Sequence, residues 1–166
     1  LGVKGAAEAG TPFRFVRPQV DAAWGRRWTA RDATLLIDGA AGMAIGDIPV
    51  QGLYLIGGRG TVPGYRFREF GGDRFVAARS VFSATVRQPW LRGRILASGG
   101  WSGAGSAGLP AMGRIGVRTT GSVLPSLGVG VGIFHDIVHV DLARGLGDDG
   151  VWEVIVEANR SFWDFL

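Results

Sequence analysis

The chain has 166 residues, which is the size of one domain, and 29 of them are glycine. The absence of cysteine excludes a disulfide scaffold, a zinc-thiolate site and a cysteine nucleophile. The formal net charge is +4, but the arginines are spread over many segments and form no run, so we expect no nucleic acid as a partner.

Period-two alternation of apolar and polar residues predicts strands along most of the chain. In chain order, the expected strands are 2–9, 14–25, 33–45, 75–88, 91–101, 124–135, 137–145 and 151–163. Most of them exceed the ~5–6 residues of an ordinary strand and match the ~9–11 residues that cross a bilayer at a tilt. An open sheet edge is unfavourable in lipid. We therefore expect an all-β fold of about eight antiparallel transmembrane β-barrel strands, which either close into a barrel themselves or join other strands that do.

The two faces of these strands differ in polarity. In 75–88, Val76, Phe82 and Val86 share one face, while Arg79 and Arg87 lie on the other. A lipid-facing wall requires the first kind of face, and a water-filled lumen tolerates the second. The polar residues expected to face the lumen are Arg79, Arg87, Asp141, Glu153 and Glu157.

The connections differ in length at the two ends of the strands. The expected connections at 28–32, 88–91 and 135–137 are short, whereas those at 46–74 and 102–123 are long. Short periplasmic turns and longer external loops are typical of outer-membrane barrels. The links at 9–13 and 145–150 are short at the external end, so the asymmetry is partial.

The connection at 46–74 is longer than the ~12–15 residues that ordinary loops reach, and such loops are usually functional or disordered. It contains Tyr54, Tyr65, Phe67 and Phe70, which a solvated linker would not carry. We expect this segment to fold back into the barrel, with its aromatic residues and arginines packed against lumen-facing side chains.

The stretch LIGGRGTVPGYRFREFGGDRFVAARSVFSATVR resembles the signature of the bacterial surface-antigen barrel of the BamA/TamA outer-membrane assembly family. In that family a long external loop with a Val-Arg-Gly-Phe/Tyr motif enters the lumen, and five strands follow it. The present loop motif is Gly57, Gly58, Arg59, Val62, Pro63, Gly64, Tyr65 and Arg66. SLGVGVGIFHDIVHVDLARGL also resembles the family's penultimate hairpin, and the resemblance covers roughly 33–166.

Two positions depart from the family pattern. Pro63 replaces the motif arginine, which in the family pairs with an acidic strand residue, and Ser83 stands where that acid is usual. Arg59 or Arg66 are candidate replacements for the arginine. Their candidate partners are Glu69, Asp73, Glu153 and Glu157, and the pairing stays open at this point.

The end of the chain, RSFWDFL, resembles the C-terminal targeting signal of outer-membrane proteins. The signal residues would be Phe162, Trp163 and Phe165, although the family ends on Phe and this chain ends one residue later. Aromatic residues near a strand end also fit the interfacial belt of a barrel, which is an equally good interpretation.

No catalytic, metal or cofactor site is expected. His135 and His139 lack a third ligand at fixed spacing, so we interpret them as a turn residue and a lumen residue. Glu153 and Glu157 lie ~13 Å apart along one strand, which is wider than the ~5–9.5 Å of paired glycosidase carboxylates. The chain is therefore not expected to be an enzyme.

By resemblance, residues 1–166 are the C-terminal part of an outer-membrane β-barrel domain, integral to the bacterial cell outer membrane. The eight strands would then be half of the family's sixteen-stranded barrel. The implied function is the insertion or translocation of polypeptides, with unfolded outer-membrane or secreted polypeptides, periplasmic accessory proteins and outer-membrane lipids as partners. One alternative is a membrane anchor or passive pore for an upstream module. Another is a self-contained eight-stranded barrel.

Overall fold

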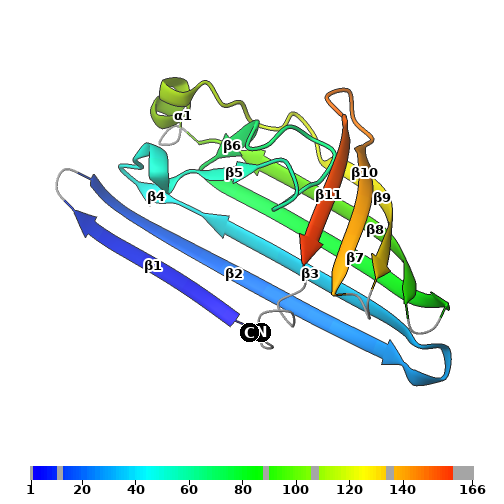
Figure 1. Ribbon diagram of the computed structural model, residues 1–166. Coiled ribbons are helices and arrows are strands. Elements are labelled where there is room, and N and C mark those ends of the chain that lie inside the picture. The colour runs from blue at the N-terminus through cyan, green and yellow to red at the C-terminus, as the bar shows by residue number, and fades with distance from the viewer. Residues whose placement is uncertain (1, 11–12, 88–89, 106–108, 134–136, 159–166) are drawn as a thin grey trace.

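A single antiparallel sheet dominates the computed structural model, which describes residues 2–10, 13–87, 90–105, 109–133 and 137–158, with side chains from Arg14 onward. Its long strands are β1 (Gly2–Gly10), β2 (Phe13–Trp28), β3 (Ala33–Met43), β7 (Arg74–Arg87), β8 (Leu91–Gly103), β9 (Leu124–Ile133), β10 (Val138–Gly145) and β11 (Trp152–Ala158). They pair in the order β1-β2-β3-β7-β8-β9-β10-β11 (Figure 1). The all-β antiparallel class expected from the sequence is confirmed, and so are its eight long strands.

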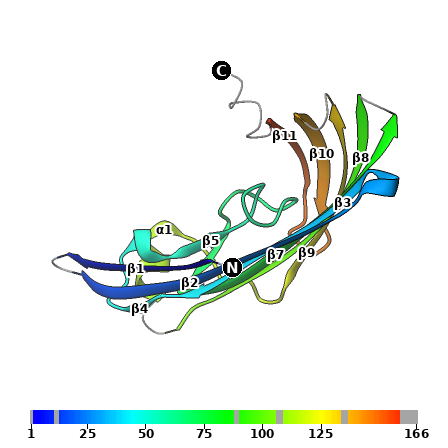
Figure 2. The same ribbon diagram turned by 90° about the horizontal axis from the view of Figure 1, so that it is seen from below.

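The sheet is strongly curved. β9, β10 and β11 rise out of the surface formed by β1, β2 and β3, which gives the sheet a concave and a convex side (Figure 2). In the described part of the chain, β1 pairs only with β2 and β11 only with β10, so the sheet is not closed into a barrel.

Two strand ends differ from the sequence-based expectation. β2 continues to Trp28, so that the turn expected at 28–32 is reduced to the 3₁₀ turn Thr29–Arg31. The strand expected at 33–45 is interrupted at Ala44, which is buried against the segment after it, and resumes as β4 (Ile45–Gly46) paired with β2. The longer end of β2 is paired locally, Trp28 with Ala33. Local alternation could not reveal the break at Ala44, because its N–H donates to the Asp73 carbonyl and β4 pairs with Phe15 and Val16, all distant in sequence.

The two long connections contain elements that the sequence did not predict. The first holds the 3₁₀ turn Val50–Gly52 and a small hairpin of β5 (Tyr54–Ile56) and β6 (Phe70–Gly72). The second holds α1 (Leu109–Ile115). None of the helices in the described residues is long and apolar enough to cross a membrane.

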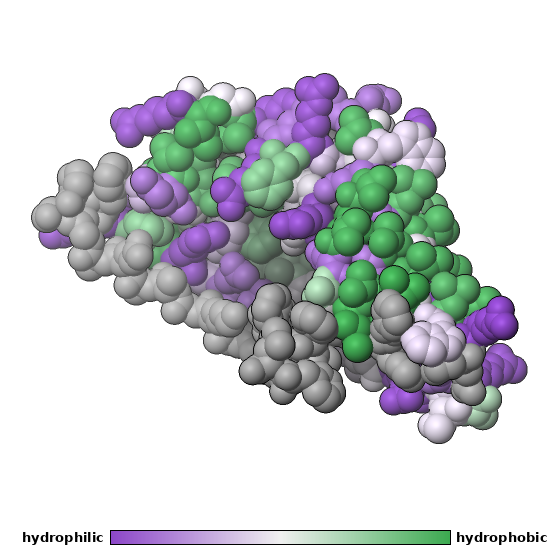
Figure 3. All heavy atoms as spheres, in the orientation of Figure 1, coloured by the Kyte–Doolittle hydropathy of each residue, from purple (hydrophilic) through white to green (hydrophobic). Residues whose placement is uncertain are grey.

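Apolar side chains form continuous rows across the convex face. One row joins six strands through direct register partners: Leu35, Phe82, Ile95, Val129, Leu142 and Val154. Val129 and Val154 are 60% and 66% exposed, although they are large hydrophobic residues in the middle of strands. Figure 3 shows this apolar surface over β10 and β11, with polar side chains in the hollowed middle of the molecule.

The concave face carries small and polar residues at the alternate positions. Its matching row is Thr34, Ser83, Arg94, Gly130, Asp141 and Ile155. Because side chains alternate between faces along a strand, this arrangement follows directly from the period-two pattern of the sequence. The predicted lumen residues Arg79, Asp141, Glu153 and Glu157 lie on this face, and Arg87 is exposed at the end of β7 after a register shift.

The hydrophobic core lies between the concave face and residues 46–74, which we call the inner loop. Its buried members are Ala44, Ile48, Leu53, Tyr54, Ile56, Val62, Tyr65, Phe70, Phe75, Ala111, Met112 and Leu124. Tyr54 and Phe75 stack with ring centroids 4.4 Å apart, which joins the inner loop to β7. The inner loop is thus packed against the concave side of the sheet through these buried residues (Figure 2).

Candidate functional site

The tip of the inner loop, residues 57–69, is shaped by glycine. Gly57, Gly58 and Gly64 have φ angles of 120°, 79° and 86°, a region that side-chain-bearing residues rarely adopt. The Thr61 hydroxyl accepts a hydrogen bond from the Gly57 N–H at 2.8 Å, which fixes the turn between them. These glycines allow the tip to bend sharply and to approach the sheet with its backbone.

Gly64 is the point of closest approach. Its carbonyl accepts hydrogen bonds from the N–H groups of Gly145 (3.1 Å) and Val151 (2.8 Å), which lie at the facing ends of β10 and β11. A Cβ atom at Gly64 would overlap the backbone of Arg144 and Gly145. Only glycine therefore fits at this motif position, both for its φ angle and for its space.

Glu153, at the start of β11, holds the other side of the same tip. Its two carboxylate oxygens accept hydrogen bonds from the backbone N–H groups of Arg59 (3.1 Å) and Gly64 (2.8 Å). Glu153 was one of the candidate partners for a replacement arginine. The contacts to Glu153 are made by backbone N–H groups and not by a guanidinium, and among the described residues neither Arg59 nor Arg66 forms an ion pair with the candidate acids.

Tyr65 binds the tip to β9 and to the β10–β11 connection. Its side chain is 1% exposed, and its hydroxyl donates to the Pro125 carbonyl (2.9 Å) while accepting from the Gly147 N–H (3.0 Å). Val62 is fully buried against Gly100 of β8, where a Cβ atom would come within 2.5 Å of the valine. The motif residues Val62, Gly64 and Tyr65 therefore all bind the concave side of the sheet.

The remaining motif residues are placed differently. Pro63 is buried, whereas Arg59 and Arg66 are exposed, and Phe67 is 67% exposed. The expectation that the arginines and all the aromatic residues of this segment pack against the strands is therefore wrong for Arg59, Arg66 and Phe67. Hydrophobicity alone could not separate Phe67 from Tyr65, because the loop bends between them.

Arg118 fastens the base of the inner loop. Its guanidinium lies 2.8 Å from Glu69 and 2.9 Å from Asp149, which belongs to the β10–β11 connection. Hydrogen bonds to Asp149 and then to Glu69 raise the pKa of Arg118 above its usual value. The inner loop and two other connections thus meet at one guanidinium.

A buried ion pair crosses the middle of the concave face. The Arg94 Nε lies 3.0 Å from an Asp141 carboxylate oxygen, and the two side chains are 7% and 1% exposed. They come from β8 and β10, with Gly130 of β9 between them. A Cβ atom at Gly130 would overlap the Asp141 carboxylate, so the glycine makes room for the pair.

Two further groups of polar contacts lie on the side of the ion pair away from the loop tip. The His139 Nε2 lies 3.2 Å from Glu157 of β11. Asp32 accepts a hydrogen bond from the Thr85 hydroxyl and lies 3.3 Å from the Arg92 guanidinium. The Thr85 hydrogen bond, assisted by Arg92 and opposed by burial, holds the pKa of Asp32 below its usual value.

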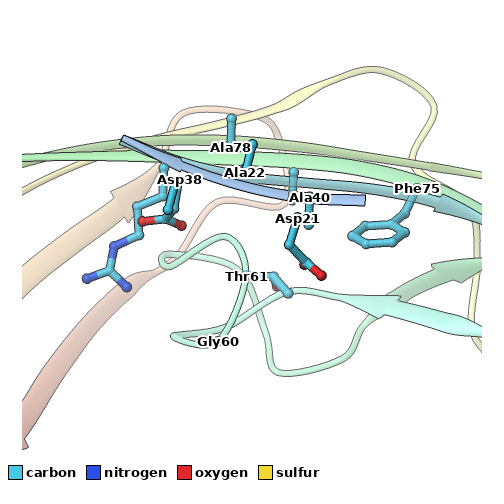
Figure 4. Close-up of a pocket in the computed structure, with 12 residues that line it drawn as sticks. Asp21, Ala22, Asp38, Ala40, Gly60, Thr61, Phe75 and Ala78 are labelled. Atoms are coloured by element: carbon cyan, nitrogen blue, oxygen red, sulfur yellow. The ribbon is translucent and has the colours of Figure 1, made fainter. Parts of the chain in front are cut away.

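A cavity of about 430 Å³ separates the loop tip from β2, β3 and β7. Asp21 and Asp38 point from the sheet toward Gly60 and Thr61, as Figure 4 shows. Arg79 also lines the cavity, together with alanines and Phe75. This mixed charged lining suits water and polar chains rather than a purely apolar ligand.

Comparison with models of known protein families gives no match, and comparison with curated protein sequences gives none either. The family resemblance stays a hypothesis that rests on the loop motif and the strand arrangement. The signal residues Phe162, Trp163 and Phe165 lie outside the described residues, as does His135. Within the described part of the chain, no group of three or more His, Cys, Asp or Glu side chains could hold a metal ion.

Two functional candidates were missed from the sequence. Arg94 and Gly130 carried no signal of their own, because their significance depends on the register that aligns them with Asp141. In β9, glycine occupies every second position from Gly128 to Gly132 (LGVGVGI), so one face of the strand carries no side chains there. A strand face without side chains, between two strands that carry charged residues, could have indicated that the charged side chains meet over the glycines.

Proposed function

We propose that this chain forms half of a transmembrane β-barrel of the BamA/TamA type in the bacterial outer membrane, where it takes part in inserting or translocating polypeptides. The observation that carries the proposal is the two-sided curved sheet with the inner loop bound to its concave face. The convex face is apolar in continuous rows, the concave face is polar, and a glycine-rich motif binds inside the curve.

The convex face favours lipid as its surroundings. Its exposed hydrophobic residues include Val76, Ile95, Val129, Leu142 and Val154. Contiguous apolar surface of this kind is rare on soluble monomers and marks an interaction surface. A bilayer accounts for its extent better than a protein partner does, because the apolar rows continue across six neighbouring strands.

The free edges of β1 and β11 favour a larger closed barrel. Unpaired N–H and C=O groups at a sheet edge cost several kcal/mol each in lipid. Additional strands between β1 and β11 would satisfy them, and the eight strands present would then be half of a sixteen-stranded barrel. The inner loop would occupy its lumen, and the cavity beside Asp21 and Asp38 would be part of the water-filled interior.

Polypeptide insertion or translocation follows from the family resemblance, with unfolded outer-membrane or secreted polypeptides and periplasmic accessory proteins as partners. No covalent chemistry is required of the chain in this role. A membrane anchor or a passive pore would use the same barrel without acting on a client.

Reconstitution separates these possibilities. We expect vesicles containing the protein to accelerate the folding of a small client barrel, and an anchor or pore to leave that rate unchanged. A matched pair of variants tests the barrel itself. Val129→Arg on the convex face should cost ~2–4 kcal/mol of insertion free energy, whereas Asp38→Arg, at an exposed position on the concave face beside the cavity, should still allow insertion. Equal insertion of wild-type protein and Val129→Arg would refute the membrane assignment.

A further inference from the structure

A groove opens on the convex side where β2 turns into β3. It encloses about 520 Å³ and is lined by Trp28, Ala30, Arg31, Ala33 and Phe82. We call it the turn groove. Volumes of ~300–1,000 Å³ are typical of small-molecule sites.

The sequence explains why a depression forms there. The convex row through Ala33 continues through Ala84 and Gly93, which are small, while the next row contains the bulky Phe82. Trp28 and Phe82 contact each other, with ring centroids 6.5 Å apart and a tilt of 57°, and together cover Ala33, which is 4% exposed. The two rings form one apolar wall, and the slot beside this wall suits a flexible apolar chain.

Guanidinium groups surround the slot at the end nearest the turn. The Arg26 guanidinium lies 5.3 Å from the Trp28 ring centroid, and Arg31 lines the groove itself. Both arginines are exposed, and neither forms an ion pair with a carboxylate in the described residues. The nearest acid, Asp32, already contacts Thr85, Arg92 and Arg27.

We propose that the turn groove binds one acidic glycerophospholipid, with an acyl chain against the rings of Trp28 and Phe82 and the phosphate on Arg26 and Arg31. The charge complementarity is direct, because guanidinium groups bind phosphate oxygens through paired N–H donors. The site also lies where a barrel wall meets the polar boundary of a bilayer, the depth at which tryptophan is favoured. This proposal rests on the membrane placement proposed above.

Fluorescence quenching by brominated lipids tests the site. The protein is reconstituted into phosphatidylcholine vesicles that contain either brominated phosphatidylglycerol or brominated phosphatidylcholine at the same mole fraction. The signal of Trp28 is the difference between wild-type protein and Trp28→Phe. Each arginine near an anionic lipid raises the binding constant about fivefold. For two arginines we therefore expect phosphatidylglycerol to be enriched at Trp28 over phosphatidylcholine by roughly 10- to 30-fold.

Three variants divide the outcomes. Arg26→Gln with Arg31→Gln should abolish the preference, and the control pair Arg66→Gln with Arg68→Gln, which removes the same charge from the inner loop, should retain it. Ala33→Leu should also abolish the preference, since the larger side chain pushes the two rings out into the slot while leaving both arginines. If Ala33→Leu retains it, the attraction is general electrostatics and the groove is not a site.

The remaining outcomes separate this inference from the proposed function. Equal quenching of Trp28 by the two brominated lipids, with Trp101 and Trp152 also quenched, would overturn the lipid site and leave the barrel standing. Absence of quenching at all of these tryptophans would mean that the protein is not in the bilayer, and both proposals would fall together.

Discussion

Replacing Glu153 by glutamine should release the tip of the inner loop from β11. The carboxylate accepts two backbone hydrogen bonds, at 3.1 Å from Arg59 and 2.8 Å from Gly64. Glutamine keeps one acceptor oxygen and presents an NH₂ group to the second donor. Hydrogen bonds to charged groups contribute ~1.5–3 kcal/mol, and because Glu153 is partly exposed we expect a loss of ~2 kcal/mol for the change. That corresponds to a population of released loop raised roughly 30-fold.

Thiol labelling measures this population directly. The chain has no cysteine, so Val62→Cys introduces a single thiol at a fully buried position of the tip. The alkylation rate of this thiol should rise roughly 30-fold when Glu153→Gln is added. Glu157→Gln is the matched control, because Glu157 lies on the same face of β11 and contacts His139 rather than the inner loop. An unchanged rate in Glu153→Gln, or an equal rise in both variants, would refute the assignment of Glu153 as the anchor.

Three further perturbations test other contacts. Gly130→Ala should cost ~3 kcal/mol or more of unfolding free energy by displacing Asp141 from Arg94, whereas Gly99→Ala, whose added carbon meets only ordinary contacts from 3.7 Å, should lower the thermal midpoint little. Tyr65→Phe should cost ~1–3 kcal/mol by leaving the Pro125 carbonyl and the Gly147 N–H without a partner, which denaturant titration measures; a value near zero would contradict the docked geometry. Because the pKa of Asp32 is lowered in the folded state, its stabilisation is present above its unfolded pKa of ~3.9 and is lost as pH falls through the folded value. The stability difference between wild-type protein and Asp32→Asn should therefore shrink in thermal scans below about pH 4, and a difference independent of pH would exclude this role.

The long strands could be predicted because their signal is local. Alternation places Val129 on one face of β9 and Gly130 on the other without knowledge of any other strand. The partners of the loop motif could not be predicted in the same way. Glu153 and Glu157 carry the same charge on the same face, and only the end of the strand at which the tip arrives distinguishes them.

The chemical group that contacts Glu153 could not be predicted from the resemblance either. The resemblance suggests an arginine side chain, with Arg59 or Arg66 in place of the residue that Pro63 replaces, whereas two backbone N–H groups make the contact. Backbone donors are identical in every sequence except at proline. The direction in which these backbone N–H groups point depends on the positive φ angles at Gly57, Gly58 and Gly64, which the sequence pattern does not specify.

The anchoring of the inner loop has a consequence for the order in which the chain assembles. The hydrogen bonds of Gly64 and Arg59 to Glu153 join residues 89 and 94 positions apart in sequence. During synthesis, the loop tip emerges well before its docking surface on β10 and β11. The base of the inner loop can pack on β7 earlier, through Tyr54 and Phe75, but the tip lacks its Glu153 hydrogen bonds until the last hairpin has paired. We therefore expect burial of Tyr65, which contacts Pro125 and Gly147, to report that the C-terminal strands have reached their final register, which makes docking of the tip a late step in folding.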